Sequence, residues 1–249
     1  MPADLQSTLR LDGRAILITG GARRLGRAFA LACASAGADI FLSHAHSPAE
    51  AGATRKEIEA FGRQAWVLQA DLSVPEQAQG LIRQACEIRP LFGLVNNAAI
   101  FSPLSLAETS LESWQEHLAI NLTAPFLLSQ AFAAALPPTT QGRIVNILDW
   151  RALRPGKDHL PYTISKAGLA ALTSSSALAL APAITVNGLA LGAILPPVDG
   201  EVEGPAVELG PLGHWARIED VQQALLFLLA GPGYITGEII HVDGGRHLV

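Results

Sequence analysis

Short β-rich apolar runs and helix-forming segments alternate along almost the whole chain. The apolar runs, each expected to form a strand, span residues 15–19, 38–43, 64–70, 91–97, 142–148, 183–190 and 238–245. Between them lie segments with the helical spacing of apolar residues: 23–37, 49–62, 73–88, 110–136, 161–181 and 218–231. Ser73 is expected to cap the third of these helices. Strands that alternate with helices form parallel sheets joined by right-handed crossovers. The sequence therefore predicts an α/β fold, a doubly wound seven-stranded parallel sheet with helices on both faces, in a single domain over residues 1–249.

Composition narrows the kinds of function that such a domain can have. Apolar residues make up 49% of the 249 residues and charged residues 16%, which excludes a disordered chain. The 17 lysines and arginines are scattered, so no basic stripe for nucleic acid is expected. Neither a signal peptide nor an uninterrupted apolar stretch of about 18 residues is present. The seven histidines lack metal-ligand spacing. We expect a cytoplasmic protein that contacts neither membrane nor nucleic acid and holds no metal.

A glycine-rich turn, "ITGGARRLGRA", joins the first predicted strand to the first predicted helix. Its pattern is Thr19-Gly20-x-x-x-Arg24-x-Gly26. Glycines at this place let the backbone approach a pyrophosphate, and the start of the helix offers unpaired N–H groups with a partial positive charge. The strand-turn-helix context makes dinucleotide binding a better interpretation than a plain structural turn.

The end of the second predicted strand indicates which dinucleotide is bound. NAD sites carry an acidic residue there for the ribose 2′-hydroxyl, whereas the segment "FLSHAHSPAE" has no acid before Glu50. Arg23 or Arg24 can supply positive charge, and Ser47 can donate a hydrogen bond to a 2′-phosphate. NADPH is therefore favoured over NADH. His46 is placed in the same site, with a cap of an exposed loop as its alternative role.

The segment "NILDWRALRPGKDHLPYTISKAG" carries three groups suited to proton transfer. Tyr162 and Lys166 are four residues apart and share one face of a predicted helix. Asp149 follows the strand 142–148 directly. Because ligands bind beyond the carboxyl ends of parallel strands, Asp149 is expected at the functional edge of the sheet.

Together these motifs resemble the short-chain dehydrogenase/reductase family, over essentially the whole chain. The resemblance rests on the glycine-rich turn, "ADLS" (70–73), "NNAA" (96–99), "NLTAPF" (121–126), Tyr162-x-x-x-Lys166 and "YITGEIIHVDGG" (234–245), in family order. It implies a Rossmann fold, an NADP-dependent oxidoreductase and a homotetramer. The usual Pro-Gly beside the nicotinamide is Leu191-Gly192 in this chain.

The resemblance also assigns roles to individual residues. Tyr162 would be the proton donor, with its pKa depressed by the charge of Lys166, which would also hold the nicotinamide ribose. Asn121 would anchor a proton-relay water, and Asp71 would contact the adenine. With the loop residues above, the expected cofactor site is Gly20, Arg23, Arg24, Leu25, Gly26, His46, Ser47, Asp71, Leu72, Asn97, Ala98, Tyr162, Lys166, Gly192 and Ile194.

Two departures from the common family pattern point to the substrate. Asp149 stands where most members have a serine, and Arg24 stands where most have a turn glycine. Both changes are similar to the pteridine reductase branch, in which an aromatic residue at the place of Phe101 stacks on the pterin. The expected substrate contacts are Arg24, Phe101, Asp149, Trp150 and Tyr162, with packing as an alternative role for Trp150.

The chemistry of the aspartate supports this interpretation. Reduction of a ring C=N bond needs a hydride on carbon and a proton on the adjacent nitrogen, and a serine hydroxyl is a poor acid. A carboxyl group in an apolar pocket can have its pKa raised and work with a tyrosine. The prediction is a pteridine reductase, with the Pro- and Gly-rich segment 194–215 as a substrate loop. The alternatives are a reductase of ordinary carbonyl substrates and an inactive nucleotide-binding regulator.

Overall fold

The computed structural model describes residues 9–195 and 210–249 of the chain. Its seven parallel strands are β1 (Ala15–Ile18), β2 (Asp39–His44), β3 (Ala65–Gln69), β4 (Gly93–Asn96), β5 (Gly142–Asp149), β6 (Ile184–Leu191) and β7 (Ile239–Val242). They form one sheet in the order β3-β2-β1-β4-β5-β6-β7. The order reverses between β1 and β4, which is where a doubly wound sheet opens a crevice for a ligand. The predicted α/β fold and all seven strands are confirmed.

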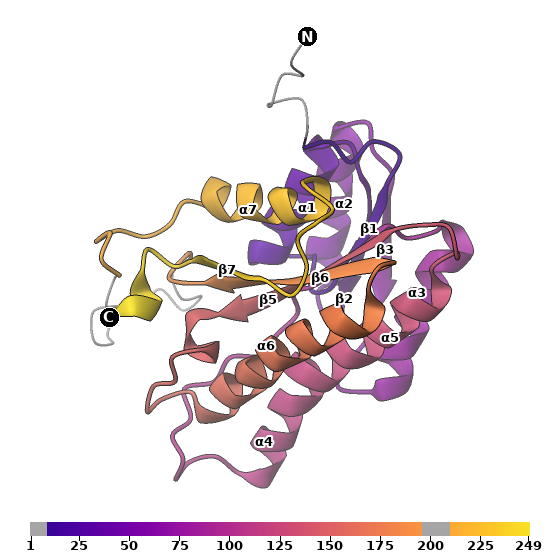
Figure 1. The fold of residues 1–249 in the computed structure, drawn as a ribbon. Helices are drawn as coiled ribbons and strands as arrows, with labels where there is room; N and C mark the ends of the chain where they lie inside the picture. The colour runs from indigo at the N-terminus through magenta and orange to yellow at the C-terminus, as the bar shows by residue number, and fades with distance from the viewer. Residues whose placement is uncertain (1–8, 196–209) are drawn as a thin grey trace.

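Helices cover both faces of the sheet, as Figure 1 shows. The first face carries α1 (Arg24–Ser35), α2 (Pro48–Ala60) and α7 (Ile218–Ala230), and the second carries α3 (Pro75–Ile88), α4 (Leu111–Leu118), α5 (Ala124–Ala135) and α6 (Leu160–Leu180). Three further short helical segments are η2 (Ala119–Thr123), η3 (Trp150–Ala152) and η4 (Arg246–Leu248). The sheet is thus the middle of three layers.

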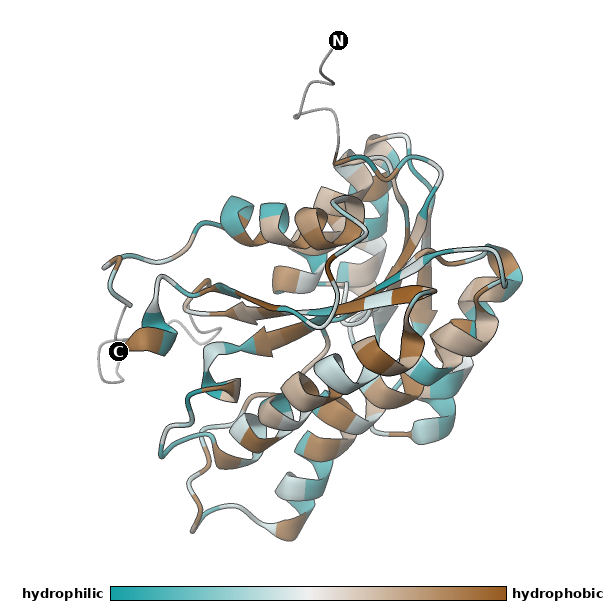
Figure 2. Ribbon diagram, in the orientation of Figure 1, coloured by the Kyte–Doolittle hydropathy of each residue, from teal (hydrophilic) through white to brown (hydrophobic). Residues whose placement is uncertain are grey.

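The core of each face is built from alternate residues of the same strands. In β1, Ile16 and Ile18 pack with α1 and α7, while Leu17 packs on the opposite side with α3 and α5. All three residues are fully buried. Because successive side chains of a strand point to opposite faces, a strand covered on both sides must be apolar throughout. Figure 2 shows this as hydrophobic colouring along the strands of the middle layer.

The fourth predicted helix is one continuous helix with a π-helical turn inside it. Ser110 caps its start by accepting a hydrogen bond from the backbone N–H of Ser113 (3.1 Å). The π-helical turn η2 contains Asn121, and π-turns of this kind occur often at functional sites. The helix Leu111–Ala135 is long and apolar enough to cross a membrane, which the sequence analysis did not expect. Its Leu128 and Phe132 are fully buried in the core of the second face.

The third predicted helix begins one residue later than expected. Its N-cap position is Val74, and the Ser73 side chain makes no cap. The Ser73 hydroxyl instead donates a hydrogen bond to Asp71 Oδ1 (2.7 Å), because that carboxylate lies two residues away in the same turn. This contact orders the loop that follows β3 at the carboxyl edge of the sheet.

Candidate active site

The glycine-rich turn after β1 has the backbone that its sequence requires. Gly20 has φ +62°, and a Cβ at Gly26 would lie 2.0 Å from the carbonyl oxygen of Gly20. Arg24, the first residue of α1, also adopts a left-handed conformation (φ 52°), which an L side chain rarely does. Most members of the family that this chain resembles have a glycine at this position. Arg24 therefore adopts the backbone conformation that a glycine would have there. Arg23 and Arg24 are both exposed, and Leu25 is partly buried.

Thr19, which the sequence analysis did not assign to the site, ties this turn to the end of β4. Its hydroxyl oxygen accepts hydrogen bonds from the backbone N–H groups of Asn97 (2.9 Å) and Ala98 (3.0 Å). The Asn97 amide donates to the carbonyl of Thr19 (2.8 Å). The predicted residues Gly20, Asn97 and Ala98 are therefore held side by side where the strand order reverses. Since Thr19 stands in the quoted turn motif, its position was the signal for this role.

Replacing Gly26 with alanine is expected to weaken NADPH binding by about tenfold or more, because the new methyl group would displace the Gly20 carbonyl. Isothermal titration with NADPH measures the change. Gly52→Ala is the matched control, since Gly52 lies in α2 with open space around its Cβ position. Its affinity for NADPH should stay within about twofold of the original. Equal weakening in the two variants would contradict this account of the turn.

The ends of β2 and β3 form the neighbouring part of the same edge. His46 is exposed and Ser47 partly buried, just after β2, and Leu72 is buried. Hydrogen bonds from Ser73 lower the pKa of the Asp71 carboxyl, and the charge of His46 acts in the same direction, so His46 and Asp71 face a common region. The glycine cradle, the start of α1, the guanidinium groups of Arg23 and Arg24 and the hydroxyl of Ser47 fit a dinucleotide with a 2′-phosphate.

Asp149 and Tyr162 are brought together at the carboxyl end of β5. The phenol of Tyr162 donates a hydrogen bond to Asp149 Oδ2 (3.2 Å), and the backbone N–H of Arg151 donates to Asp149 Oδ1 (2.8 Å). Burial raises the pKa of the Asp149 carboxyl, against the hydrogen bond from the Arg151 backbone and the charges of Arg151 and Lys166. The sequence prediction that this aspartate belongs with the tyrosine agrees with this geometry.

The prediction of a depressed pKa for Tyr162 is wrong in this structure. Burial raises the pKa of the phenol well above its ordinary value, and the negative charge of Asp149 and its hydrogen bond add to the rise. The Lys166 ammonium lies 5.8 Å from the centre of the tyrosine ring. Burial and the adjacent Asp149 carboxylate therefore outweigh the charge of the lysine, and the phenol keeps its proton at neutral pH.

Lys166 and Asn121 complete the predicted catalytic set, and both are almost fully buried. The Lys166 ammonium donates to the carbonyl of Ile147 (2.7 Å). The Asn121 side chain accepts from the backbone N–H of Ile100 (2.9 Å) and donates to the Ser165 hydroxyl (3.0 Å). Asn121 thus fixes the loop after β4 against α6, and its π-turn lets it reach both.

Burial lowers the pKa of Lys166 from 10.5 to about 8, although the charge of Asp149 opposes this. Lys166→Met is therefore expected to raise the free energy of unfolding at pH 7 by up to roughly 3 kcal/mol. The unfolded chain keeps the lysine proton up to about pH 10.4, whereas the folded chain loses it near pH 8. The original protein therefore gains stability with rising pH across this window, and the advantage of the variant shrinks.

Denaturant unfolding at pH 7 and pH 10 measures this difference. Lys56→Met is the control, because Lys56 is exposed on α2, and it should change the free energy of unfolding by less than about 0.5 kcal/mol at either pH. A stability gain for Lys166→Met that is the same at both pH values would contradict the assigned cost of burying the ammonium.

Phe101, predicted to contact the substrate, lies against Tyr162 and has a second neighbour that the sequence analysis missed. Its ring meets that of Tyr162 edge-on, with centroids 4.6 Å apart, and stacks on His159 with centroids 4.2 Å apart. His159 precedes α6 in a left-handed conformation and contacts Asp158 (2.9 Å). Phe101 is 55% exposed, so its ring is accessible beside Tyr162 and Asp149. An Asp-His pair directly before the tyrosine helix was the available signal.

Two guanidinium groups contact the ring of Trp150. Arg151 lies over its ring at 4.7 Å, and Arg246, near the end of the chain, lies over it at 4.3 Å. Arg151 also pairs with Asp158 (3.1 Å), which links it to the His159 and Phe101 stack. The sequence analysis considered two roles for Trp150, substrate contact and packing. The structure adds a third role, which is to position Arg151 beside Asp149.

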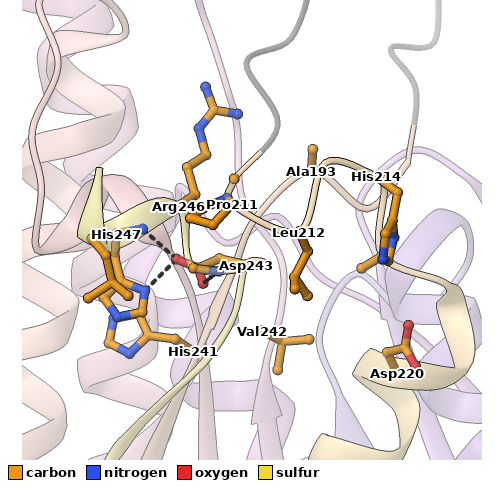
Figure 3. A pocket seen from close by; sticks show the side chains of 15 residues that line it. Ala193, Pro211, Leu212, His214, Asp220, His241, Val242, Asp243, Arg246 and His247 are labelled. Atoms are coloured by element: carbon orange, nitrogen blue, oxygen red, sulfur yellow. Dashed lines mark hydrogen bonds and ion pairs between the residues drawn. The ribbon is translucent and has the colours of Figure 1, made fainter.

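Gly192 and Ile194, predicted to contact the cofactor, follow β6. The backbone N–H of Gly192 bonds to the carbonyl of Val242 (3.0 Å), and a Cβ at Gly192 would lie 2.7 Å from the Cα of Asp243. Ile194 is buried. Beyond them lies a cavity of about 490 Å³ lined by Ala193, residues of 210–216, Asp220 and 241–248. Figure 3 shows the Asp243 carboxylate there, bonded to His247. Asp149, Tyr162 and Lys166 do not line this cavity.

The structure covers only part of the residues that bear on two further predictions, the substrate loop and the absence of a metal site. The proposed substrate loop 194–215 falls mostly on 196–209, which lie outside the described residues. Over residues 9–195 and 210–249, no group of three or more histidine, cysteine, aspartate and glutamate side chains is arranged to hold a metal ion.

Comparison with known proteins agrees with this geometry. The family model described as "Enoyl-(Acyl carrier protein) reductase" matches residues 20–247. The chain is 32% identical to a 3-oxoacyl-[acyl-carrier-protein] reductase of Synechocystis sp., over 94% of this chain and 97% of that protein.

Two solved structures of relatives contain the predicted cofactor. One is a blue fluorescent protein from a metagenomic library, in complex with NADPH (35% identity, TM-score 0.89, covering 95% of this chain and 99% of that chain). The other is FolM alternative dihydrofolate reductase 1 from Brucella canis, with NADP (34% identity, TM-score 0.87, covering 96% of each chain). With the glycine turn and the Asn121, Tyr162 and Lys166 arrangement, these matches show that the chain belongs to the short-chain dehydrogenase/reductase family of NAD(P)-dependent oxidoreductases.

Proposed function

We propose that this protein is an NADPH-dependent reductase of a pteridine, which takes a dihydropterin or dihydrofolate to its tetrahydro form. The observation that carries the proposal is the hydrogen bond from Tyr162 to a partly buried aspartate, Asp149, where most of the family has a serine. Phe101 beside Tyr162 and the arginine at position 24 add support. So does the similarity to the Brucella canis protein, whose name includes dihydrofolate reductase.

In this proposal the chain's own residues hold and deliver the proton. NADPH supplies the hydride when bound. The phenol of Tyr162 keeps its proton at neutral pH and offers it to the ring nitrogen, and the raised pKa of Asp149 lets that carboxyl group replace it. Lys166 keeps a positive charge within reach of both groups. Phe101 offers an aromatic face to a flat heterocycle, an arrangement that aromatic systems favour.

A reductase of carbonyl substrates is the second candidate. It is favoured by the relative in Synechocystis sp., named for reduction of a 3-oxoacyl group, and by the matching family model. Under this candidate Asp149 replaces the serine hydroxyl that would orient a carbonyl oxygen. An inactive regulator is disfavoured, because Asn121, Tyr162 and Lys166 are all present and all buried, and Asn121 is linked through the Ser165 hydroxyl to the backbone of Tyr162.

Steady-state oxidation of NADPH separates the candidates. The purified protein is given dihydrobiopterin, dihydrofolate or a short 3-oxoacyl thioester, and kcat/KM is determined for each. The pteridine proposal predicts that one of the two pteridines exceeds the thioester by at least about a hundredfold, which is roughly 3 kcal/mol of transition-state binding. A preference for the thioester would favour the second candidate.

We propose further that the protein is a cytoplasmic homotetramer. Apolar side chains exposed on the second face of the sheet support association, among them Leu111 (70% exposed), Phe126 (45%) and Leu178 (85%). Light scattering after size-exclusion chromatography tests this, and a monomer at micromolar concentration would exclude it.

A further inference from the structure

A second group of cations lies at the edge of the sheet opposite to the catalytic pair. Arg14 precedes β1 directly, and Arg143 is the second residue of β5, whose last residue is Asp149. At about 3.3 Å per residue, Arg143 lies roughly 20 Å from Asp149 along the strand. Arg14 and Arg143 open onto a cavity of about 390 Å³, whose other lining residues are Arg10, Leu11, Phe92, Thr139, Thr140, Gln141, Leu229 and Ala230.

The guanidinium of Arg143 is buried without a full set of partners. The residue is only 9% exposed, and its Nε has no hydrogen-bond partner among the residues that the structure describes. Its Nη1 donates one long hydrogen bond to the Thr185 hydroxyl (3.3 Å). A Cβ at Gly233 would lie 3.0 Å from Nη2, so the absence of a side chain there leaves room for the group. The guanidinium of Arg143 therefore offers N–H donors that a ligand could use.

The charge of Arg143 is also uncompensated within the described residues. The guanidinium of Arg14 lies over the ring of Phe92 at 4.0 Å. Burial of Arg143 lowers its pKa, and the positive charge of Arg14 lowers it further. Arg10 is paired with Asp12 (2.7 Å). Over residues 9–195 and 210–249, neither Arg14 nor Arg143 forms an ion pair with a carboxylate. Burying one cation beside another costs free energy, which a bound anion would offset.

We propose that this cavity binds a small phosphate-bearing anion, held by Arg143 and Arg14. A planar guanidinium group can donate two parallel hydrogen bonds to two oxygens of a phosphate. Two such groups at one site favour a phosphate over a single carboxylate. Thr139, Thr140 and Gln141 also line the cavity, and residues of these types can supply neutral donors. The cavity is larger than one phosphate group, so it suits a diphosphate or the ester of a small molecule. This site is independent of the reaction at Asp149.

Isothermal titration of pyrophosphate into the protein carrying one equivalent of NADP tests the proposal, because NADP then occupies the phosphate sites of the catalytic edge. The expected result is saturable binding of one pyrophosphate per chain. Arg143→Met and Arg14→Met should each raise Kd by at least about tenfold. The control Arg55→Met should leave Kd unchanged, since Arg55 is an exposed residue of α2 that pairs with Glu59. Citrate at matched ionic strength should bind more weakly.

Thermal unfolding separates a ligand site from a structural arginine. In phosphate-free buffer Arg143→Met should melt at a higher temperature than the original protein, because an uncompensated buried charge is removed. Pyrophosphate should raise the melting temperature of the original protein and leave that of the variant unchanged. The proposal is wrong if the original protein shows no saturable binding or binds citrate as tightly. It is also wrong if Arg143→Met lowers the melting temperature equally with and without pyrophosphate.

Discussion

Replacement of Asp149 by serine is expected to lower kcat for a dihydropterin by about a hundredfold or more, the usual contribution of a positioned proton-transfer group. The serine hydroxyl cannot supply a proton to Tyr162, whereas the carboxyl group that it replaces bonds to the phenol directly. Reduction of a simple ketone should fall by much less, because a hydroxyl orients a carbonyl oxygen well. Steady-state NADPH oxidation with both substrates measures the two effects.

The pH dependence gives the same prediction a second test. Burial raises the pKa of Asp149, so its carboxyl group stays protonated to a higher pH than an ordinary aspartate does. Dihydropterin reduction should therefore decline as pH rises through this raised pKa, and the decline should be absent in Asp149→Ser. Asp158→Asn is the control, since Asp158 contacts Arg151 and His159 rather than Tyr162, and kcat should change by less than about threefold. Equal losses in both variants would assign the effect to general electrostatics.

Tyr162→Phe is expected to lower kcat by about a thousandfold for every substrate, pteridine or carbonyl. The hydroxyl is the one group of this side chain that bonds to Asp149, and its raised pKa keeps the transferable proton on oxygen. The phenylalanine ring retains the edge-on contact with Phe101. Affinity for NADPH should change by less than about tenfold, because most of the expected cofactor contacts lie on other elements.

Stopped-flow measurement of a single turnover separates chemistry from product release in this variant. The control is Thr163→Val, since Thr163 is the next residue of α6 and is buried, and its hydroxyl has no hydrogen-bond partner within the described part of the chain. It should retain nearly full activity. If Tyr162→Phe kept more than about a tenth of the single-turnover rate, the phenol would not be the proton donor.

The sequence predicted the fold well because the alternation of elements is a local property. In β1, three consecutive buried apolar residues, Ile16, Leu17 and Ile18, serve both faces, and such a run indicates a covered parallel strand. Position at the carboxyl end of a strand was likewise enough to place Asp149 at the functional edge of the sheet. Both arguments use only neighbours in sequence and the rule that parallel strands end at a common edge.

The features that sequence reasoning missed depend on residues distant in the chain. The pKa of Tyr162 is set by burial and by Asp149 more than by the lysine one turn away, and burial cannot be read from a spacing. The stack of His159 on Phe101 joins two loops nearly sixty positions apart. Arg14 and Arg143 each lie at the start of a strand, and nothing in the sequence around either residue distinguishes it. The order of the strands in the sheet brings the two residues together.

Family membership alone leaves the substrate open, since relatives at similar identity are named for 3-oxoacyl and for dihydrofolate reduction. The residues that differ from the common pattern therefore carry the specific proposal. Asp149 is the most informative of them, because it contacts the phenol of Tyr162, the proposed proton donor.

Transfer of deuterium tests this proposal most directly. The protein is incubated with NADPH deuterated at C4 of the nicotinamide, together with a dihydropterin and a 3-oxoacyl thioester in competition, and the products are analysed by mass spectrometry and NMR. The account predicts deuterium on the ring carbon of a tetrahydropterin, with little label in the hydroxyacyl product. Label found only in the hydroxyacyl product would contradict the pteridine assignment and establish the carbonyl reductase in its place.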